Sequence, residues 1–154
     1  MIKVNVILNN LKWKKYLKSP NSYINKKVFL LNKKNKSFKS KRFIITLLLS
    51  GTSEIKKLNK KFRNKNKSTD ILSFPFYDKK ILRNKIKLEK EIYVGDIILN
   101  INKIKFKNNK TKFYDEFNKL WIHGLVHLFG HKHKKNTDYY LMQKIENKYL
   151  AYIK

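Results

Sequence analysis

The segment TKFYDEFNKLWIHGLVHLFGHKH, residues 111–133, carries the clearest structural signal in the chain. Its apolar residues recur every three or four positions, which predicts a helix from Thr111 to about Phe129 with one buried face. Gly130 follows, and a glycine at this place can adopt the left-handed conformation that ends a helix. The predicted buried face consists of Phe113, Phe117, Leu120, Trp121, Gly124, Leu125 and Leu128.

All four histidines of the chain lie within the last eleven residues of this segment. His123 and His127 are four residues apart, so they share one helix face at the flank of the apolar stripe, where both imidazoles can bind one ion. Once Gly130 turns the chain, a third histidine can approach from another direction. On a continued helix His131 would stand about 12 Å along the axis from His123, too far for zinc–nitrogen bonds of about 2.1 Å. A turn at Gly130 would make both His131 and His133 available, and we favour His133 as the third ligand because its five-residue gap from His127 is the one found in known three-histidine sites.

Three imidazoles predict one transition-metal ion, most simply zinc, because the chain has no cysteine to supply a thiolate. Structural zinc sites normally have four protein ligands, so three histidines leave a position for water and favour a catalytic site. Two alternatives stay open: Asp138 could close a structural site, and the histidines could be ordinary polar groups at a helix end. Metzincin peptidases share this histidine spacing, but they place a glutamate base directly after the first histidine, where this chain has Gly124.

The rest of the chain predicts a single α+β domain spanning residues 1–154. Pro75 cannot donate a ladder hydrogen bond, so the strand before it is predicted to lie at a sheet edge or to end at Pro75, and Gly95 predicts a bulge or a close approach. Thr52 or Ser53 is expected to cap the helix that follows the second strand. Strands are predicted over residues 2–8, 43–49, 70–74 and 92–99. Further helices are predicted over 13–31 with an interruption near 19–21, after 52, over 101–106, and after 136, where the last helix carries Leu141, Ile145 and Tyr149. Residues 33–41 are predicted as a basic loop and residues 79–90 as a basic loop or hairpin arm.

The chain carries a formal net charge of +28, from 38 basic and 10 acidic residues. A positive field of this size attracts polyanions, of which RNA is the commonest. Lys, Asn and Ile supply 70 of the 154 residues and only three basic residues are Arg, so we attribute roughly half of the excess to the codon bias of an AT-rich genome. No apolar stretch approaches the roughly 18 residues of a membrane span, and the N-terminus lacks a signal-peptide pattern, so a cytoplasmic location is expected.

Two further segments precede the histidines in a recognisable order. One is Leu58-Asn59-Lys60-Lys61-Phe62-Arg63 followed by Lys67-Ser68-Thr69-Asp70-Ile71-Leu72-Ser73-Phe74-Pro75, and the other is Gly95-Asp96-Ile97. Together with His123, Gly124, His127, Leu128, Gly130 and His133, these motifs resemble the YbeY family of bacterial rRNA maturation factors, which are single-strand-specific endoribonucleases. The resemblance covers residues 58 to 133. It departs from the family pattern at His131-Lys132, where the family has Tyr-Asp.

The resemblance implies a mixed sheet of about four strands packed with helices, and a cleft that holds the histidine motif at the end of a long helix. It also implies that Arg63 belongs to the active site, where a guanidinium can clamp phosphate oxygens during phosphodiester cleavage. The simpler alternative for Arg63 is a solvated cation at a helix C-terminus. Asp70 and Asp96 are candidate acids behind the metal ligands, and Glu116, two turns before His123, is a candidate replacement for the missing family Asp.

We therefore expect a metal-dependent endoribonuclease, with zinc held by His123, His127 and His133, acting in rRNA maturation and ribosome quality control. The resemblance implies single-stranded rRNA and the ribosome or a ribosomal subunit as partners, with no DNA and no membrane. Two other functions stay open. One is a non-catalytic ribosome-assembly factor whose metal only joins the last two helices, and the other is a metallopeptidase of altered mechanism.

Overall fold

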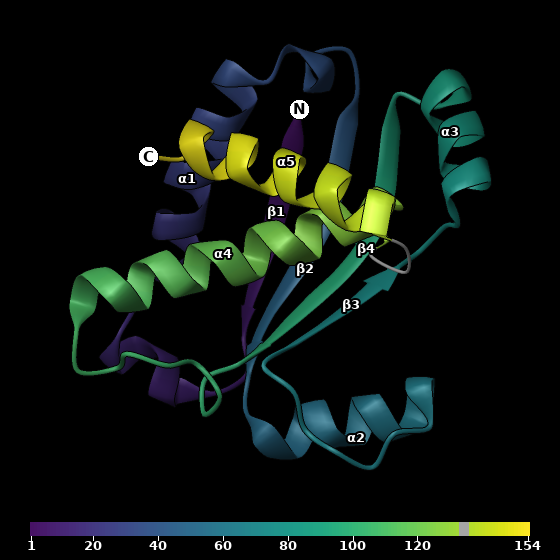
Figure 1. Ribbon diagram of the computed structural model, residues 1–154. Helices are drawn as coiled ribbons and strands as arrows, with labels where there is room; N and C mark the ends of the chain where they lie inside the picture. The colour runs from purple at the N-terminus through teal and green to yellow at the C-terminus, as the bar shows by residue number, and fades with distance from the viewer. Residues whose placement is uncertain (133–135) are drawn as a thin grey trace.

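A four-stranded sheet forms the centre of the computed structural model, which describes residues 1–132 and 136–154 (Figure 1). The strand order is β1-β2-β4-β3. β1 (Ile2–Leu8), β2 (Arg42–Ser50) and β4 (Glu91–Asn100) are mutually parallel, and β3 (Ile71–Pro75) pairs antiparallel with β4 at the edge. The predicted mixed sheet of about four strands is confirmed, and so is the edge position of the strand that ends at Pro75.

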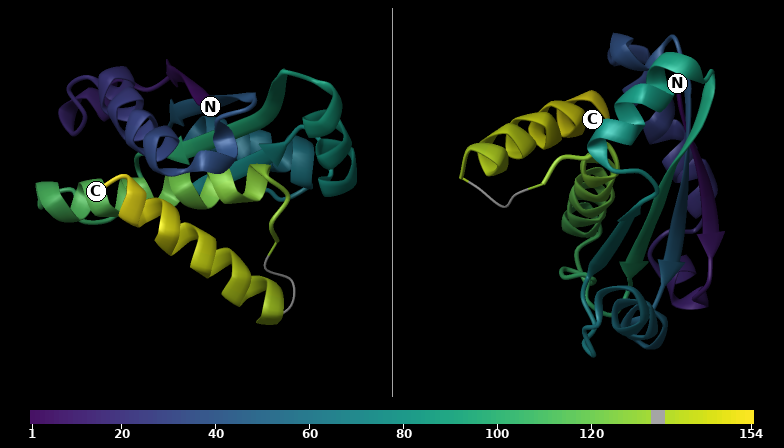
Figure 2. Two further views of the ribbon diagram at one scale, coloured as in Figure 1. Left: turned by 90° about the horizontal axis from the view of Figure 1, so that it is seen from above. Right: turned by 90° about the vertical axis from the view of Figure 1, so that its right-hand side faces the viewer.

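Helices cover the two faces of the sheet unequally. The main core joins one face to α1, α4 and α5, while a smaller cluster joins the opposite face to α2. Figure 2 shows α4 and α5 on the same side of the sheet. Among the described residues, no helix is long and apolar enough to cross a membrane. The helices are α1 (Pro20–Lys34), α2 (Thr52–Arg63), α3 (Lys79–Leu88), α4 (Lys110–Leu128) and α5 (Asn136–Tyr152), with short 3-10 helices η1 (Leu11–Lys15) and η2 (Lys36–Phe38).

The predicted long helix is confirmed as α4, and its apolar stripe forms the middle of the core. Phe117, Trp121 and Leu125 are fully or almost fully buried, and only Leu120 of the predicted stripe remains partly exposed. Gly124 brings the helix close to the sheet, because a Cβ there would lie 2.8 Å from the Ile97 side chain. The absence of a side chain at Gly124 therefore determines how near α4 comes to β4.

Two predicted segments are wrong. Residues 79–90 were expected as a basic loop or hairpin arm, but most of them form α3, because the Asp78 carboxylate accepts hydrogen bonds from the Lys80 and Ile81 backbone N–H groups and caps the helix. Interspersed lysines obscure the apolar stripe around the buried Leu82. The short helix expected over 101–106 is a series of turns that reaches Phe106 in a left-handed conformation (φ 55°).

Smaller corrections concern helix ends and faces. α2 is capped by Gly51 without a side-chain hydrogen bond, and not by Thr52 or Ser53. α1 extends to Lys34, into the predicted basic loop 33–41. In α5 the buried residue is Met142, whereas Leu141 remains 49% exposed. Each of these differences moves a boundary or a face by one or two residues and leaves the architecture intact.

Gly95 is the residue at which β4 needs a backbone that only glycine adopts readily. The register between β2 and β4 shifts at this point, and Gly95 has φ 141°, which confirms the predicted bulge. A Cβ at Gly95 would lie 2.2 Å from the Phe74 carbonyl oxygen of β3. We therefore expect Gly95→Ala to lower the free energy of unfolding by about 3 kcal/mol, measured by urea denaturation.

The matched control is Gly51→Ala. A Cβ at Gly51 would meet the amide end of the Asn10 side chain at 2.6 Å, which can rotate away, and no positive φ is involved. We expect a loss of no more than about 1 kcal/mol. Equal losses for the two variants would contradict the role assigned to the Gly95 backbone.

Candidate active site

His123 and His127 project from the last two turns of α4 with their Nε2 atoms facing each other at 3.0 Å. Both side chains are partly buried, as predicted for the border between core and solvent. The Nδ1 atom of His123 lies 2.8 Å from Glu146 Oε1 on α5, and the Nδ1 atom of His127 lies 2.8 Å from the His131 backbone carbonyl oxygen. Both partners of the Nδ1 atoms are acceptors, so each Nδ1–H can donate to its partner. The tautomer with the proton on Nδ1 places the lone pair of each Nε2 on the side of the other ring.

Gly130 ends α4 as predicted. It has φ 83°, and its N–H donates to the His127 carbonyl at 2.9 Å. The turn returns the chain along α4, so that the His131 carbonyl reaches the His127 ring. His131 and Lys132 then lie beside the two helical histidines. His133, the predicted third ligand, lies outside the described residues.

Gly124 faces the sheet and not the histidine pair. A Cβ at this position would lie 3.1 Å from Ile71 as well as 2.8 Å from Ile97. A glutamate in the position used by metzincin peptidases would have to enter the apolar interface between α4 and the sheet. The structure therefore gives a packing reason for the absence of that base.

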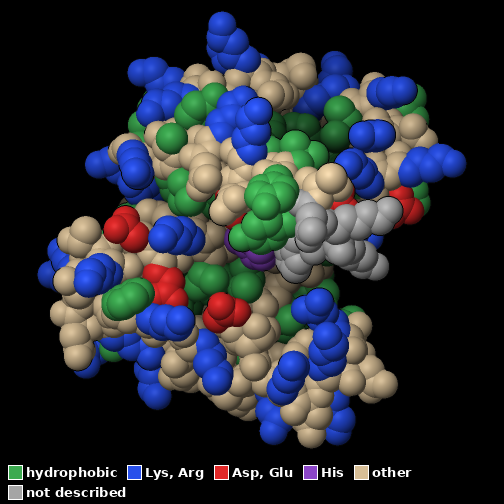
Figure 3. Space-filling model, in the orientation of Figure 1, with side chains coloured by type: hydrophobic (Ala, Val, Ile, Leu, Met, Phe, Trp, Pro, Cys, Tyr) green, Lys and Arg blue, Asp and Glu red, His purple; other side chains and the backbone are tan. Residues whose placement is uncertain are grey.

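Arg63 and the two helical histidines line one cavity of about 670 Å³. α2 supplies Arg63 to this cavity, and β3 supplies Ile71, Ser73 and Pro75 to its wall. Lys79, at the start of α3, also lines the cavity. In the space-filling view the histidines are visible at the base of a hollow, with Lys and Arg side chains on the lobe below it (Figure 3). The cavity is lined by Arg63, Ile71, Ser73, Pro75, Phe76, Tyr77, Asp78, Lys79, His123, His127, Gly130, His131 and Lys132.

The position of Arg63 depends on how α2 ends. Asn64 adopts a left-handed conformation (φ 54°), and its N–H donates to the Lys60 carbonyl. The buried Asn59 side chain then holds the following loop, because its Nδ2 donates to the Lys67 carbonyl at 2.7 Å. These contacts turn the chain directly after Arg63 and leave its exposed side chain at the cavity.

The lining contains positive charge, polar groups and exposed aromatic surface. Phe76 is 62% exposed and contacts Tyr77 edge to face, with ring centroids 4.9 Å apart. Burial lowers the pKa of His131, and the Lys79 ammonium lowers it further. His131 is therefore a neutral imidazole at neutral pH, and Lys79, Lys132 and Arg63 supply the positive charge around the histidine pair.

The three candidate acids have other contacts. The Asp70 carboxylate accepts from the Thr69 hydroxyl and from the Ile71 backbone N–H, both at 2.9 Å. Asp96 accepts a hydrogen bond from the Tyr93 hydroxyl, and Glu116 accepts from the Lys105 backbone N–H at 3.0 Å. None of the three lines the cavity at the histidines.

The acid that contacts a candidate ligand is Glu146, which the sequence analysis missed. Its carboxylate is partly buried and lies on α5, twenty-three residues beyond His123. The available signal was the inward face of the last helix, since Glu146 directly follows Ile145 of the predicted stripe. Within residues 1–132 and 136–154, no group of three or more His, Cys, Asp or Glu side chains is placed to hold a metal ion, so the described part of the site is a histidine pair.

Comparisons with known proteins agree on one family. The model of a family described as Endoribonuclease YbeY matches residues 8–154. An Endoribonuclease YbeY from Pelagibacter ubique is 38% identical over 156 residues, covering 100% of this chain and 97% of its own length. Its counterpart from Karelsulcia muelleri is 35% identical, covering 82% and 80%. The solution structure of TM1509 from Thermotoga maritima has a similar fold, with a TM-score of 0.58 at 24% identity over 99% of this chain and 89% of that one.

The contacts of the Nδ1 atoms predict one tautomer for each helical histidine. In metal-free protein in alkaline buffer, where imidazoles are neutral, His127 should carry its proton on Nδ1, because a carbonyl oxygen accepts from that atom. Long-range ¹H–¹⁵N NMR distinguishes this form from the Nε2–H form. Glu146→Ala should leave the His127 signal unchanged while altering that of His123. An Nε2–H form of His127 would contradict the geometry described above.

Proposed function

We propose that this chain, which belongs to the endoribonuclease YbeY family, is a metal-dependent endoribonuclease that cleaves single-stranded RNA at the cavity lined by Arg63, His123 and His127. The proposal rests on one observation: the Arg63 guanidinium and the two oriented imidazoles line the same cavity. Arg63 comes from α2 and both histidines come from α4, and they meet there although Arg63 and His123 are sixty residues apart in the sequence. A purely structural role for Arg63 would not require this position.

The histidine pair fits a metal ion. Ligand atoms of a tetrahedral zinc site with bonds of about 2.05 Å are separated by about 3.3 Å, close to the 3.0 Å between the two Nε2 atoms. Metal-binding histidines usually donate their other N–H to a carboxylate or a backbone carbonyl, which are the partners of His123 and His127 here. We propose zinc as the metal and His133 as its third ligand, because His133 follows the cavity residue Lys132 directly.

Phosphodiester cleavage develops negative charge on the non-bridging oxygens of the phosphate. Arg63 would bind two of these oxygens at once through its planar fork, which a lysine cannot do. Lys79 and Lys132 would draw the strand into the cavity. When bound, zinc supplies a Lewis acid that polarises a phosphoryl oxygen or lowers the pKa of water. Glu146 would keep the His123 ring in place during these events, since its contact restrains rotation of the imidazole.

The proposed substrate is ribosomal RNA, in rRNA maturation and ribosome quality control in the cytoplasm, with the ribosome or one of its subunits as partner. Family membership supports this assignment, and the net charge of +28 is compatible with it. The metallopeptidase alternative is disfavoured, because position 124 points into the apolar interface with Ile71 and Ile97. An assembly factor whose metal only joins α4 to α5 is disfavoured by the apolar residues that already connect the two helices to one core.

Replacing Arg63 with Ala tests its catalytic role. We expect cleavage of a single-stranded rRNA fragment to fall at least about a hundredfold, because the charge that develops on the phosphate loses its main partner. The melting temperature should change little, since the side chain is exposed. Arg83→Ala is the matched control, because Arg83 is also exposed and lies outside this cavity, and it should cleave like wild type. Full activity of Arg63→Ala, or a large fall in its melting temperature, would refute the assignment.

The third ligand is tested by metal content. His127→Ala and His133→Ala should lose the metal, and His133→Ala should also lose cleavage, whereas His131→Ala should retain about one metal ion per chain. Elemental analysis of the purified proteins measures this directly. Chelation should abolish cleavage but leave the far-UV circular dichroism unchanged, because apolar packing and not the metal holds α5. Retention of metal by His133→Ala together with its loss in His131→Ala would reverse the assignment, and unfolding on chelation would favour the structural alternative.

A further inference from the structure

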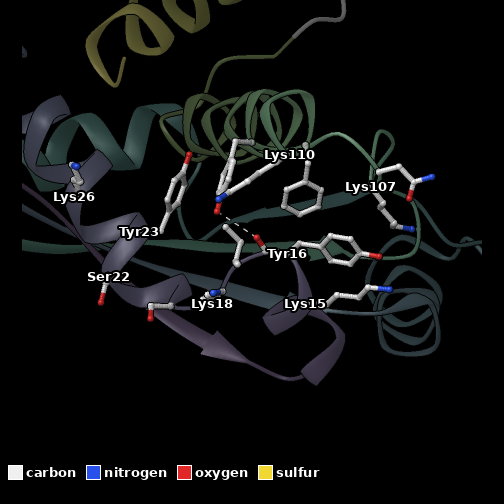
Figure 4. A pocket seen from close by; sticks show the side chains of 13 residues that line it. Lys15, Tyr16, Lys18, Ser22, Tyr23, Lys26, Lys107 and Lys110 are labelled. Carbon is white, nitrogen blue, oxygen red and sulfur yellow. Dashed lines mark hydrogen bonds between the residues drawn. The ribbon is translucent and has the colours of Figure 1, made fainter.

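A second cavity of about 670 Å³ lies at the opposite end of α4 from the histidines. The end of η1, the first turns of α1 and the segment leading into α4 line it (Figure 4). Lys110 opens α4 at this cavity, and His127 lies about 26 Å further along the helix axis. In the described part of the chain, the two cavities have no lining residue in common. We call this second cavity the distal pocket.

The described lining of the distal pocket is basic and contains no carboxylate. Most of its lysines are exposed, with only Lys107 partly buried. A concave surface focuses the field of such charges more than a convex one does. The distal pocket is therefore suited to a polyanion. Its lysines are Lys15, Lys18, Lys26, Lys107 and Lys110.

Two stacked pairs of aromatic rings form part of the same lining. Tyr16 stacks on Phe113 with centroids 5.0 Å apart, and Tyr23 stacks on Tyr114 with centroids 4.9 Å apart. The Tyr114 hydroxyl also donates to the Tyr16 backbone carbonyl at 3.4 Å. The three tyrosines are partly buried and partly exposed. Their rings are thus held in place and still present surface, which lowers the entropic cost of stacking a ligand on them.

Tyr16 combines a partly exposed ring with nearby ammonium groups. The Lys15 ammonium lies 5.9 Å from the Tyr16 ring centroid, and in Figure 4 the Tyr16 ring lies between the side chains of Lys15 and Lys107. Bases stack on aromatic rings, and ammonium groups pair with the phosphates on either side. This arrangement suits a nucleic-acid strand better than an anion without rings.

Charge alone does not single out this pocket, because Lys and Arg side chains are scattered over the visible surface (Figure 3). A third hollow, along α3, illustrates the difference. It is lined by Lys79, Lys80, Arg83 and Lys87, but the described residues of its lining include no aromatic ring. The distal pocket differs from this hollow in combining its lysines with rings that are held in place.

We propose that the distal pocket is a second binding site for single-stranded RNA, in which Tyr16 stacks on a base while Lys15 and Lys107 pair with neighbouring phosphates. The inference rests on the proposed function in taking RNA as the polyanion and the active-site cavity as the other place where the strand binds. An RNA strand bound at the active site and at the distal pocket is held at both ends of α4. Once the strand is bound at one site, its binding at the other is intramolecular, which raises the overall affinity. At 3.4 Å per phosphate, the spacing within a stacked strand, the span of about 26 Å corresponds to about eight phosphates.

The test compares two lengths of fluorescent single-stranded RNA, about five and about 20 nucleotides, because only the longer can reach both sites. Binding is measured by anisotropy over a series of salt concentrations in the Arg63→Ala background, with the RNA checked for integrity. Lys15→Ser/Lys107→Ser should raise the Kd of the long RNA about tenfold and reduce its salt slope by about 1.4, as expected for two lost phosphate contacts. The Kd of the short RNA should stay within about twofold.

Tyr16→Leu should raise the Kd of the long RNA about fivefold or more without changing the salt slope, because it removes a stacking surface and no charge. Lys33→Ser/Lys34→Ser is the matched control, since these exposed lysines lie at the other end of α1 and line neither cavity. A loss as large in this control as in Lys15→Ser/Lys107→Ser would overturn the proposal. Equal competition by polyglutamate would identify a general polyanion surface and would also overturn it.

The proposed function is tested separately, by measuring cleavage of the two RNAs. With Arg63 restored, the Lys15→Ser/Lys107→Ser variant should cleave the short RNA at the wild-type rate, because the distal pocket does not touch the reacting phosphate. If wild type cleaves neither RNA, the proposed function fails, and the anisotropy comparison still decides whether the distal pocket binds RNA. A fall in cleavage of the short RNA would contradict the separation of the two sites.

Discussion

The close approach of α4 to the sheet at Gly124 is the constraint on which the geometry of the candidate active site depends. With no side chain at this position, the helix comes near enough to Ile97 and Ile71 for its apolar stripe to be buried along most of its length. His123 and His127, at the margin of that stripe, are then held beside β3 and face the same cavity as Arg63. A bulkier residue at position 124 would push α4 outward by the size of its side chain, and the histidines would move with the helix. The packing that stabilises the core and the geometry of the cavity are thus consequences of one contact.

The second requirement is that the imidazole rings keep their orientation, and here α5 and the turn after α4 are essential. An imidazole at the edge of a core can rotate about two bonds, and a hydrogen bond to one of its ring nitrogens restrains that rotation. Glu146 engages Nδ1 of His123, and the carbonyl of His131 does the same for His127. Apolar residues such as Met142 bury one side of α5 against the main core, which places the Glu146 carboxylate at the ring. Hydrophobic packing of the last helix is therefore what positions a polar group in the site.

Local patterns in the sequence predicted the parts of this arrangement that depend on local physics. A period-two pattern located β1, short apolar stretches located the other three strands, and a period of 3.6 residues located α4. Gly130 located the end of that helix. Each of these signals lies within a few residues of the feature it specifies. α3 was missed because lysines interrupt its apolar stripe. Glu146 was missed, and Glu116 was considered in its place, because contact with His123 depends on how α5 packs against α4, which no local pattern encodes. The place of Arg63 beside the histidines was expected only through family resemblance, since it follows from the antiparallel edge position of β3 and the turn after α2.

Basic residues are abundant on this protein, yet catalysis and binding place different demands on them. To stabilise charge that exists only in a transition state, hydrogen-bond donors must already be oriented, because reorienting them during the reaction would cancel the electrostatic stabilisation. The donors of a guanidinium have a fixed planar arrangement, which suits this requirement better than a rotatable ammonium group does, and the turn fixed by Asn59 and Asn64 determines where the Arg63 backbone lies. Holding a strand requires only a favourable field and surfaces for the bases, so the rotatable lysines around Tyr16 are sufficient. A sequence enriched in lysine can therefore supply binding surface almost anywhere, while the proposed chemistry requires the one cavity that Arg63 shares with the two helical histidines.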